Sequence, residues 1–263
     1  MTSTLSGALE IVVRTDPGLV RELNEDAVFA NPARGLVILA DGMGGYNAGE
    51  VASGMAVSFL ASALETSLFE PPKNSEIDAS DCSLTRRCLK ESIERANTAV
   101  FNAANCELQY SGMGTTLVTA IFHENRITVA HIGDSRLYRL RDDQFGTITR
   151  DHSLLQEQID SGMVTPEEAR YSQNKNLVTR ALGVEPTVNP EINEFDVYPG
   201  DIYLFCSDGL NDMLFDEDIH QVLRTSSENI ESAASQLIQM ANDNGGRDNV
   251  SVVLVKVLRT FSA

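Results

Sequence analysis

Several features that mark common classes of protein are absent from this sequence. Its 263 residues include only four cysteines, and no two of them form a Cys-x-x-Cys pair. This spacing excludes a zinc knuckle and gives no sign of a disulfide framework, so we expect a reduced, cytoplasmic protein. No apolar run reaches about 18 residues, the length of a membrane span, and the first residues lack the basic and apolar regions of a signal peptide. We therefore expect no contact with a membrane.

Basic residues are scarce as well. The chain has 20 Lys and Arg against 38 Asp and Glu, which gives a formal net charge of −18. Nucleic acids and anionic membranes favour basic patches, so this balance argues against nucleic acid as a partner. It suits a protein that binds cations or basic partners.

The predicted strands and helices occur in groups along the chain instead of alternating. Short segments rich in Val, Ile and Leu predict strands at 10–15, 36–40, 116–122, 126–132, 136–140, 201–206 and 250–257. Apolar residues at three- and four-residue steps predict helices over 52–64, 89–104 and 230–241. This grouping favours an α+β fold with antiparallel pairing.

Several of these strands are apolar on both faces, which predicts sheets that are covered on both sides. We therefore expect two antiparallel β-sheets packed as a sandwich and flanked on both sides by α-helices. The only segment typical of a linker, residues 69–76, has two prolines and joins two predicted helices. The prediction is one domain over residues 9–260, after a short tail at 1–8.

Acidic residues recur at the ends of predicted strands. Four aspartates follow or precede a strand at a glycine-bearing turn, namely Asp41, Asp134, Asp208 and Asp248, and a fifth acidic point is Glu25-Asp26. Any one of them is most simply explained as an ordinary turn residue. Gathered at one end of a sheet, they would repel one another and stay partly protonated unless cations were bound.

The available ligand atoms are oxygens, supplied by carboxylates, water and the backbone carbonyl of Gly42. Such a hard oxygen set favours Mg²⁺ or Mn²⁺ over Zn²⁺, which usually recruits His or Cys. The segment 242–248 does not fit an EF-hand loop, because it lacks the alternating ligands and the terminal Glu. Two hard cations can share a water molecule and direct it at phosphorus. Arg21 then offers a guanidinium for the phosphoryl oxygens.

Other phosphatase and hydrolase chemistries lack their motifs in this chain. There is no Gly-x-Ser-x-Gly elbow and no Walker loop. The sixth residue after each cysteine is never Arg, so the Cys-x5-Arg motif of a cysteine phosphatase is missing too. Covalent cysteine chemistry is not expected.

Taken together, the motifs resemble those of the metal-dependent type-2C Ser/Thr protein phosphatases, in particular the single-domain bacterial members. The resemblance spans roughly residues 10–258. In chain order its motifs are Arg21-Glu22-Leu23-Asn24-Glu25-Asp26, Asp41-Gly42-Met43-Gly44-Gly45, Gly114-Thr115-Thr116, Gly133-Asp134-Ser135-Arg136, Ser207-Asp208-Gly209 and Gly246-Arg247-Asp248-Asn249.

The resemblance implies a set of metal ligands around two ions. Asp41 would bridge both ions, and Gly42 would offer its carbonyl to the second. Asp208 and Asp248 would ligate the first ion. The family's fold, a sandwich of two antiparallel sheets flanked by helix pairs, agrees with the fold expected above.

Further roles follow from the same motifs. Glu25 and Asp26 fall at the acidic pair that serves the second ion, directly or through water. Asp134 matches the position that helps to hold a third, weaker ion together with Asp208. Arg21 matches the phosphate-binding arginine.

The implied function is hydrolysis of phosphoserine and phosphothreonine in proteins by a hydroxide activated at a binuclear Mg²⁺ or Mn²⁺ centre, without a phosphoenzyme. The partners would be phosphorylated proteins, among them a cognate Ser/Thr kinase or its substrates. The alternative is a non-catalytic regulatory or binding module on the same fold. Loss of Asp41, Asp208 or Asp248 would favour that alternative, but all three are present.

Two regions carry less information. Residues 150–180 correspond to the flap beside the family's active site, with a helix expected at 154–161. Some members carry a general-acid histidine where this chain has Met43 or Tyr46, so we assign no general acid. His131 is expected in the core, and a contact between His152 and substrate is the less favoured of two interpretations.

Overall fold

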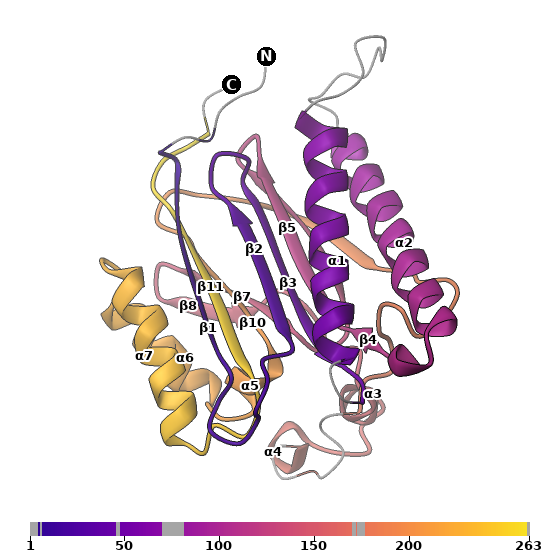
Figure 1. Ribbon diagram of the computed structural model, residues 1–263. Coiled ribbons are helices and arrows are strands. Elements are labelled where there is room, and N and C mark those ends of the chain that lie inside the picture. Colours follow the sequence, from indigo (N-terminus) through magenta and orange to yellow (C-terminus); the bar gives the residue numbers. More distant parts are fainter. Residues whose placement is uncertain are drawn as a thin grey trace.

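Two antiparallel β-sheets pack face to face, and helices cover the outer side of each, so the molecule has four layers (Figure 1). This arrangement is seen in a computed structural model that describes residues 5, 7–45, 48–69, 82–169, 172 and 177–261. It confirms the predicted α+β sandwich. The expected linker at 69–76 lies outside the described residues apart from Phe69.

The first sheet has five strands, and its two longest strands lie side by side. In spatial order these strands are β1 (Leu9–Asp16), β11 (Val250–Val257), β10 (Ile202–Cys206), β7 (Arg136–Arg141) and β8 (Gln144–Thr147). The predicted domain start at residue 9 coincides with the first residue of β1.

The second sheet has six strands. In order they are β2 (Asp26–Asn31), β3 (Leu36–Met43), β5 (Leu117–His123), β6 (Arg126–Ile132) and β9 (Glu191–Asp196), with the short β4 (Gly114–Thr115) paired to the end of β3.

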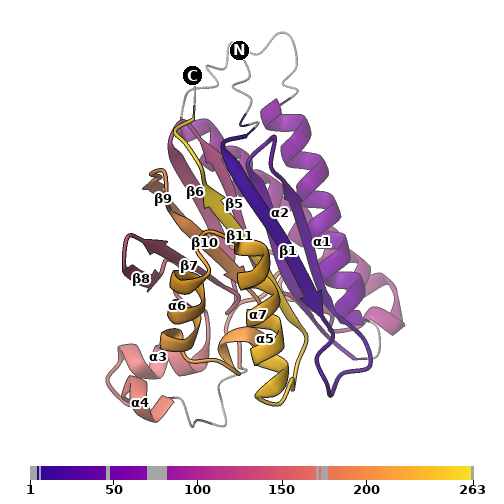
Figure 2. The ribbon, with the colours of Figure 1, turned by 90° about the vertical axis from the view of Figure 1, so that its left-hand side faces the viewer.

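A different helix pair covers each sheet (Figure 2). The second sheet is covered by α1 (Ala48–Leu64), which runs on into a π-helical turn (Glu65–Phe69), and by α2 (Cys82–Cys106). The first sheet is covered by α6 (Asp216–Thr225) and α7 (Ile230–Asp243), beside the short α5 (Asp208–Asn211). The flap holds α3 (Leu154–Asp160) and α4 (Pro166–Ala169), and a 3₁₀ turn spans Leu108–Tyr110.

Alternate residues of the central strands face different parts of the core. In β3, Val37 and Leu39 pack between the sheets, whereas Ile38 and Ala40 face the helices. In β11, Val253 lies between the sheets and Leu254 lies under the helices. A strand buried on both faces needs apolar residues at every position, which explains why these strands lack polar alternation.

One described helical stretch, Ala48–Leu68, is long and apolar enough by length and composition to cross a membrane. The sequence analysis expected no run of that length. The stretch packs against β3 and α2, and Leu60 and Leu64 are fully buried there. Its composition therefore fits a core helix, because a helix covered by both a sheet and another helix needs a wide apolar face.

Candidate metal centre

Asp26 and Asp41 stand directly opposite each other at the same end of the β2–β3 pair. Cβ atoms at such positions are about 4.5–5.5 Å apart, so the fold places two carboxylates side by side. The backbone of Asp41 is fixed by Thr115, the last residue of β4, and by Thr116, which lies between β4 and β5. Its N–H donates to Thr116 Oγ1 (3.1 Å), its carbonyl accepts from the Thr116 N–H (2.8 Å), and the Thr115 hydroxyl donates to the same carbonyl (2.8 Å).

The other sheet adds its own acids at the same end. Asp208 follows β10 as the first residue of α5, and Asp248 lies two residues before β11. Ser207 links the two sheets here, because its hydroxyl donates to Asp26 Oδ2 (2.8 Å) and accepts from the Ser251 N–H (3.0 Å). This buried serine orients the Asp26 carboxylate toward the cluster.

The β1–β2 loop, residues 17–25, is held to the centre by Asn249. The Asn249 amide donates to the carbonyls of Pro17 (3.0 Å) and Leu23 (2.7 Å), and its Oδ1 accepts from the Glu25 N–H (2.8 Å). Sequence analysis gave Asn249 no role, although it directly follows a predicted ligand. Its side chain fixes the segment that carries Arg21 and Glu25.

The start of α1 closes over the end of β3 at Gly42. The Gly42 N–H donates to the Glu25 carbonyl (3.1 Å), which also accepts from the Ser53 hydroxyl (2.6 Å). A Cβ atom at Gly42 would overlap the carbonyl of Gly49 in α1. Only glycine therefore fits here, and the main chain of β3 and α1 can approach the acidic side chains closely.

Burial and mutual repulsion make these carboxyls hard to ionise. Burial, with a smaller contribution from other aspartates, raises the pKa of Asp26 to about 6 and that of Asp134 to about 7. The same two causes raise the pKa of Asp41 and Asp208 well above the ordinary value. Burial also raises the pKa of Glu25. Raised pKa values throughout a group of carboxyls indicate that no positive charge nearby compensates their negative charges.

The atoms present fit hard divalent cations. Glu25 Oε1 and Asp26 Oδ1 are buried and have no hydrogen-bond partner within the described residues. Buried carboxylate oxygens left without donors are costly unless a cation meets them. Because the ligand atoms that face the cluster are oxygens, this group of ligands suits Mg²⁺ or Mn²⁺. All seven positions predicted as metal ligands lie together at this end of the sandwich.

Asp212 is a carboxylate that sequence analysis missed. It lies one helical turn after Asp208, and its charge contributes to the raised pKa of both Asp208 and Asp134. The four-residue spacing was the available signal, because residues that far apart share a helix face.

Arg21 lies at the rim of the cluster. Its guanidinium donates to Asp248 Oδ2 at 2.8 Å, and about half of its side chain is exposed. That contact raises the pKa of Arg21 above its usual value, and the charges of Glu25 and Asp208 act in the same direction. The one basic residue that the sequence placed in the site is therefore present there, with part of its side chain open to solvent.

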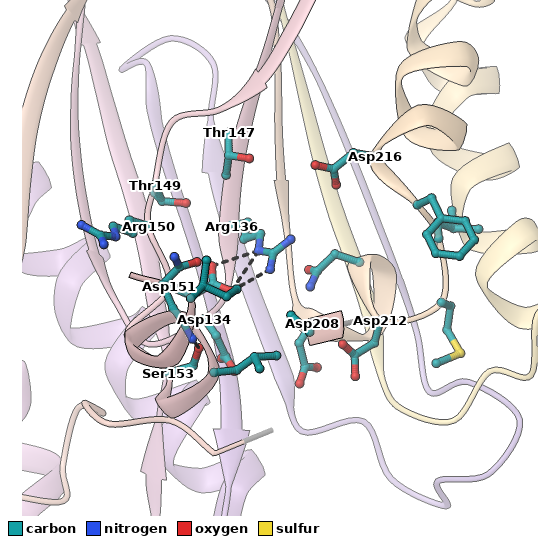
Figure 3. Close-up of a pocket in the computed structure, with 18 residues that line it drawn as sticks. Asp134, Arg136, Thr147, Thr149, Arg150, Asp151, Ser153, Asp208, Asp212 and Asp216 are labelled. Atoms are coloured by element: carbon teal, nitrogen blue, oxygen red, sulfur yellow. Dashed lines mark hydrogen bonds and ion pairs between the residues drawn. The ribbon is translucent and has the colours of Figure 1, made fainter. Parts of the chain in front are cut away.

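A cavity of about 500 Å³ opens beside the cluster, between the flap and the α5–α6 segment. Figure 3 shows Asp134, Asp208 and Asp212 near one end of it and Thr147 and Asp216 near the other. The expected flap helix is confirmed as α3, which lines one wall through Gln156 and other residues.

Three residues near the base of the flap also invite a metal interpretation. One ligand atom from each of His131, His152 and Glu191 lies within 4.8 Å of the others. However, the two imidazole rings stack at 4.7 Å and 14°, so their in-plane lone pairs run nearly parallel and do not converge on one ion. His131 Nε2 also donates to the Arg150 carbonyl (2.8 Å). We assign no ion there.

The remaining predicted positions fall as follows. Met43 ends β3, and Tyr46 lies outside the described residues. His131 is buried, as expected, and His152 is buried as well, so it does not face a substrate. Cys206 is fully buried, and burial raises the pKa of its thiol, which makes that thiol a poor nucleophile.

Two helix-covered antiparallel sheets that gather buried carboxylates and an arginine at one end define the class of metal-dependent phosphatases. Within that class, the chain belongs to the protein phosphatase 2C family, whose sequence profile matches residues 20–259.

Named relatives agree with this assignment. The Ser/Thr phosphatase stp of Listeria innocua is 38% identical over 247 residues, which cover 92% of this chain and 94% of that protein. The Ser/Thr protein phosphatase PstP of Mycobacterium tuberculosis is 40% identical over 251 residues, or 95% of this chain. The matched region is 45% of that protein, so this chain spans about half the length of that relative.

Solved structures match over nearly the whole chain. The crystal structure of M. tuberculosis PstP has a TM-score of 0.82 and 38% identity, and the match covers 95% of this chain and 99% of that chain. The catalytic domain of PstP in complex with two manganese ions has a TM-score of 0.81 and 39% identity, with 95% and 98% covered.

Proposed function

We propose that this chain hydrolyses phosphoserine and phosphothreonine in proteins, without forming a phosphoenzyme. One observation carries the proposal. Acids from five separate parts of the sequence meet at one end of the sandwich, where two buried carboxylate oxygens have no hydrogen-bond partner among the described residues, beside an arginine and an open cavity. The named relatives are Ser/Thr protein phosphatases, which supports the same substrate class.

We further propose that Glu25, Asp26, Asp41, Asp208 and Asp248, with the Gly42 carbonyl, hold two Mn²⁺ or Mg²⁺ ions. Asp134 and Asp208 would hold a third, weaker ion. When bound, such ions supply positive charge that lowers the pKa of water and neutralises phosphoryl oxygens.

The protein itself contributes orientation and charge. Arg21 extends from a loop that Asn249 fixes, so its exposed N–H groups can meet two phosphoryl oxygens in a bidentate contact. Asp248 holds that guanidinium in place through the 2.8 Å hydrogen bond. The neighbouring cavity gives room for the residues that flank a phosphorylated side chain.

Direct attack by water is favoured over a covalent step because the side chains near the cluster are poor nucleophiles. Burial holds the Cys206 thiol in its protonated form. The Ser207 hydroxyl is committed to Asp26 and to the Ser251 N–H.

The partners proposed are Ser/Thr-phosphorylated proteins, including a cognate kinase or its substrates, and the proposed location is the cytoplasm. The net charge of −18 supports the absence of nucleic acid among the partners.

The experiment that tests the function measures phosphate release from a phosphothreonine peptide. Release should stop when a chelator removes divalent ions and return when Mn²⁺ is added. Asp208→Asn should remove at least about 99% of the turnover, since even residues that only orient ligands cost 10- to 100-fold. Asp143→Asn, a change at a largely exposed acid on the surface, is the matched control and should leave turnover unchanged. No release by the wild-type chain at saturating Mn²⁺ would favour the non-catalytic module.

A further inference from the structure

His152, near the start of the flap, bonds Gly133 in the turn that carries Asp134. It is 8% exposed. Its backbone N–H donates to the Gly133 carbonyl (2.9 Å), and its imidazole Nδ1 accepts from the Gly133 N–H (3.2 Å). One flap residue therefore satisfies both backbone groups of Gly133, the residue that precedes Asp134.

Gly133 in turn contacts the residue that fixes Asp41. Its φ is +97°, and a Cβ atom there would lie 2.8 Å from Cβ and Cγ2 of Thr116. Thr116 forms hydrogen bonds with both backbone groups of Asp41. Its hydroxyl also forms a hydrogen bond of 2.7 Å with the Ser135 hydroxyl. A displacement of Gly133 would thus move Asp134 through the chain and Asp41 through Thr116.

The base of the flap is held residue by residue. The Arg150 carbonyl accepts from His131 (2.8 Å), and the Asp151 carboxylate accepts three hydrogen bonds from Arg136 at 2.7–3.1 Å. Figure 3 shows the Asp151–Arg136 contact between β7 and the flap. These neighbours attach the flap to the sheets, whereas His152 bonds the turn that carries Asp134.

We propose that His152 is a positioning residue: its imidazole fixes the Gly133–Asp134 turn and thereby couples the base of the flap to the carboxylate cluster. The coupling needs an acceptor at the Nδ1 position. The proton of the neutral ring therefore sits on Nε2, which has no hydrogen-bond partner within the described residues and lies 3.6 Å from Glu191 Oε2. The inference rests on the proposed function in one respect, which is that the carboxylate cluster binds the metal ions.

Three substitutions separate positioning from simple packing. His152→Asn places Oδ1 where Nδ1 stood and keeps the acceptor, although it fills less space. His152→Gln carries the same amide but moves its oxygen toward the Nε2 position, and His152→Leu fills the space without any acceptor. The matched control is His123→Leu, because His123 is a largely buried histidine that bonds Thr128 (2.8 Å) and touches no part of the cluster.

The first readout is hydrogen exchange of the Gly133 amide in the metal-free protein, followed by NMR. We expect exchange to accelerate about 10-fold in the Gln and Leu variants, because the hydrogen bond that protects this amide and its local order are lost. The Asn variant should stay within about threefold of wild type. The second readout is Mn²⁺ affinity by calorimetry, which should fall about 10-fold or more in the Gln and Leu variants and be retained in the Asn variant.

A role limited to packing predicts a different order, in which the smaller Asn variant is the most impaired and Leu the least. That order, or wild-type Gly133 exchange and Mn²⁺ affinity in the Gln variant, would overturn the proposal. If the Leu variant fails to fold, the Asn and Gln pair still decides it. Neither readout needs turnover, so a failure of the proposed phosphatase function would show separately, as absent phosphate release by the wild-type chain.

Discussion

Asp41 and Asp208 are partly buried acids whose charged form the metal-free chain stabilises poorly. Their raised pKa values arise from burial and from the other carboxylates of the cluster. Removing one of these charges should therefore help folding while it harms the site, since residues selected for a reaction need not favour stability.

Asp41→Asn makes this conflict measurable. We expect the melting temperature of the metal-free protein to rise by several degrees, because relief of about 1–2 kcal/mol corresponds to about 2–4 °C per kcal/mol in a chain of this size. Phosphate release at saturating Mn²⁺ should fall at least about 100-fold. Thermal unfolding and phosphate assays on the same preparation check both. A variant that is less stable and still active would contradict the role given to Asp41.

Arg21→Ala tests the phosphate contact. We expect kcat/KM for a phosphothreonine peptide to fall about 10- to 100-fold, since charge-assisted hydrogen bonds contribute about 1.5–3 kcal/mol. Mn²⁺ affinity should hold or increase, because a positive charge next to Asp248 is removed. Arg21→Lys is the control and should recover part of the rate. If Arg21 were only a counterion for Asp248, the Ala variant would keep the wild-type kcat/KM at saturating Mn²⁺.

Individual residues were predictable where a motif marked them. The cluster was predicted from the aspartates at strand ends, namely Asp41, Asp134, Asp208 and Asp248. The supporting residues Asn249 and Ser207 were not predicted, because their role depends on which distant carbonyls and carboxylates fold against them, and no local pattern records that.

At the scale of elements, the β1–β2 loop and the segment before β11 act as one unit. Gly18 has a φ of +78°, and a Cβ atom there would overlap the Asp248 carbonyl. The N–H groups of Leu19 and Val20 both donate to the Gly246 carbonyl, at 2.7 and 3.2 Å. The loop that bears Arg21 is thus held against the segment that bears Asp248.

Asn249→Ala should loosen this unit. Three hydrogen bonds of a buried side chain are lost, and the two carbonyls and one N–H left behind cost on the order of 2–4 kcal/mol. We expect a melting temperature lower by about 5–15 °C and a rise in the Mn²⁺ concentration needed for half-maximal turnover. Asn244→Ala, at an exposed asparagine whose side chain donates to the Met213 carbonyl, is the matched control. Equal effects of the two substitutions would refute the special role of Asn249.

The strands buried on both sides, such as β3 and β11, were predicted from their continuous apolar residues. The edge strands β2, β8 and β9 were missed, and the exposed positions of β8 and β9 carry polar residues, as in Gln144–Thr147. An edge strand forms through backbone pairing with its neighbour, so its own side chains give little signal.

At the scale of the whole molecule, the acid cluster links stability to pH. Burial raises the pKa of Asp26 to about 6 and that of Asp134 to about 7 in the folded chain, whereas the pKa of an aspartate in an unfolded chain is about 3.9. Between about pH 4 and pH 7 the folded state therefore binds more protons than the unfolded state, and their contribution to stability is lost as the pH rises through that range.

We accordingly expect the free energy of unfolding of the metal-free protein to decrease from pH 5 to pH 7.5. Saturating Mn²⁺ should oppose the decrease, because a ligand that binds only the folded state adds stability. Urea unfolding at several pH values, with chelator or with Mn²⁺, measures this. A metal-free protein that becomes steadily more stable over the same range would be the opposite result.

The overall architecture was predictable because grouping of strands, apolar patterns and motif order all indicate the same sandwich. How the flap packs was not, since its fixed base depends on His152 and Gly133, which lie 19 residues apart, and on contacts that only the fold creates.

The most direct test of the central claim is a calorimetric titration of Mn²⁺ into the chelator-treated protein, repeated with Asp41→Asn. Cooperation of acids from both sheets predicts saturable binding of about two ions per chain, with a further weak phase, and loss of the tight phase in the variant. Absence of saturable binding in the wild-type protein, or an identical titration of the variant, would contradict it.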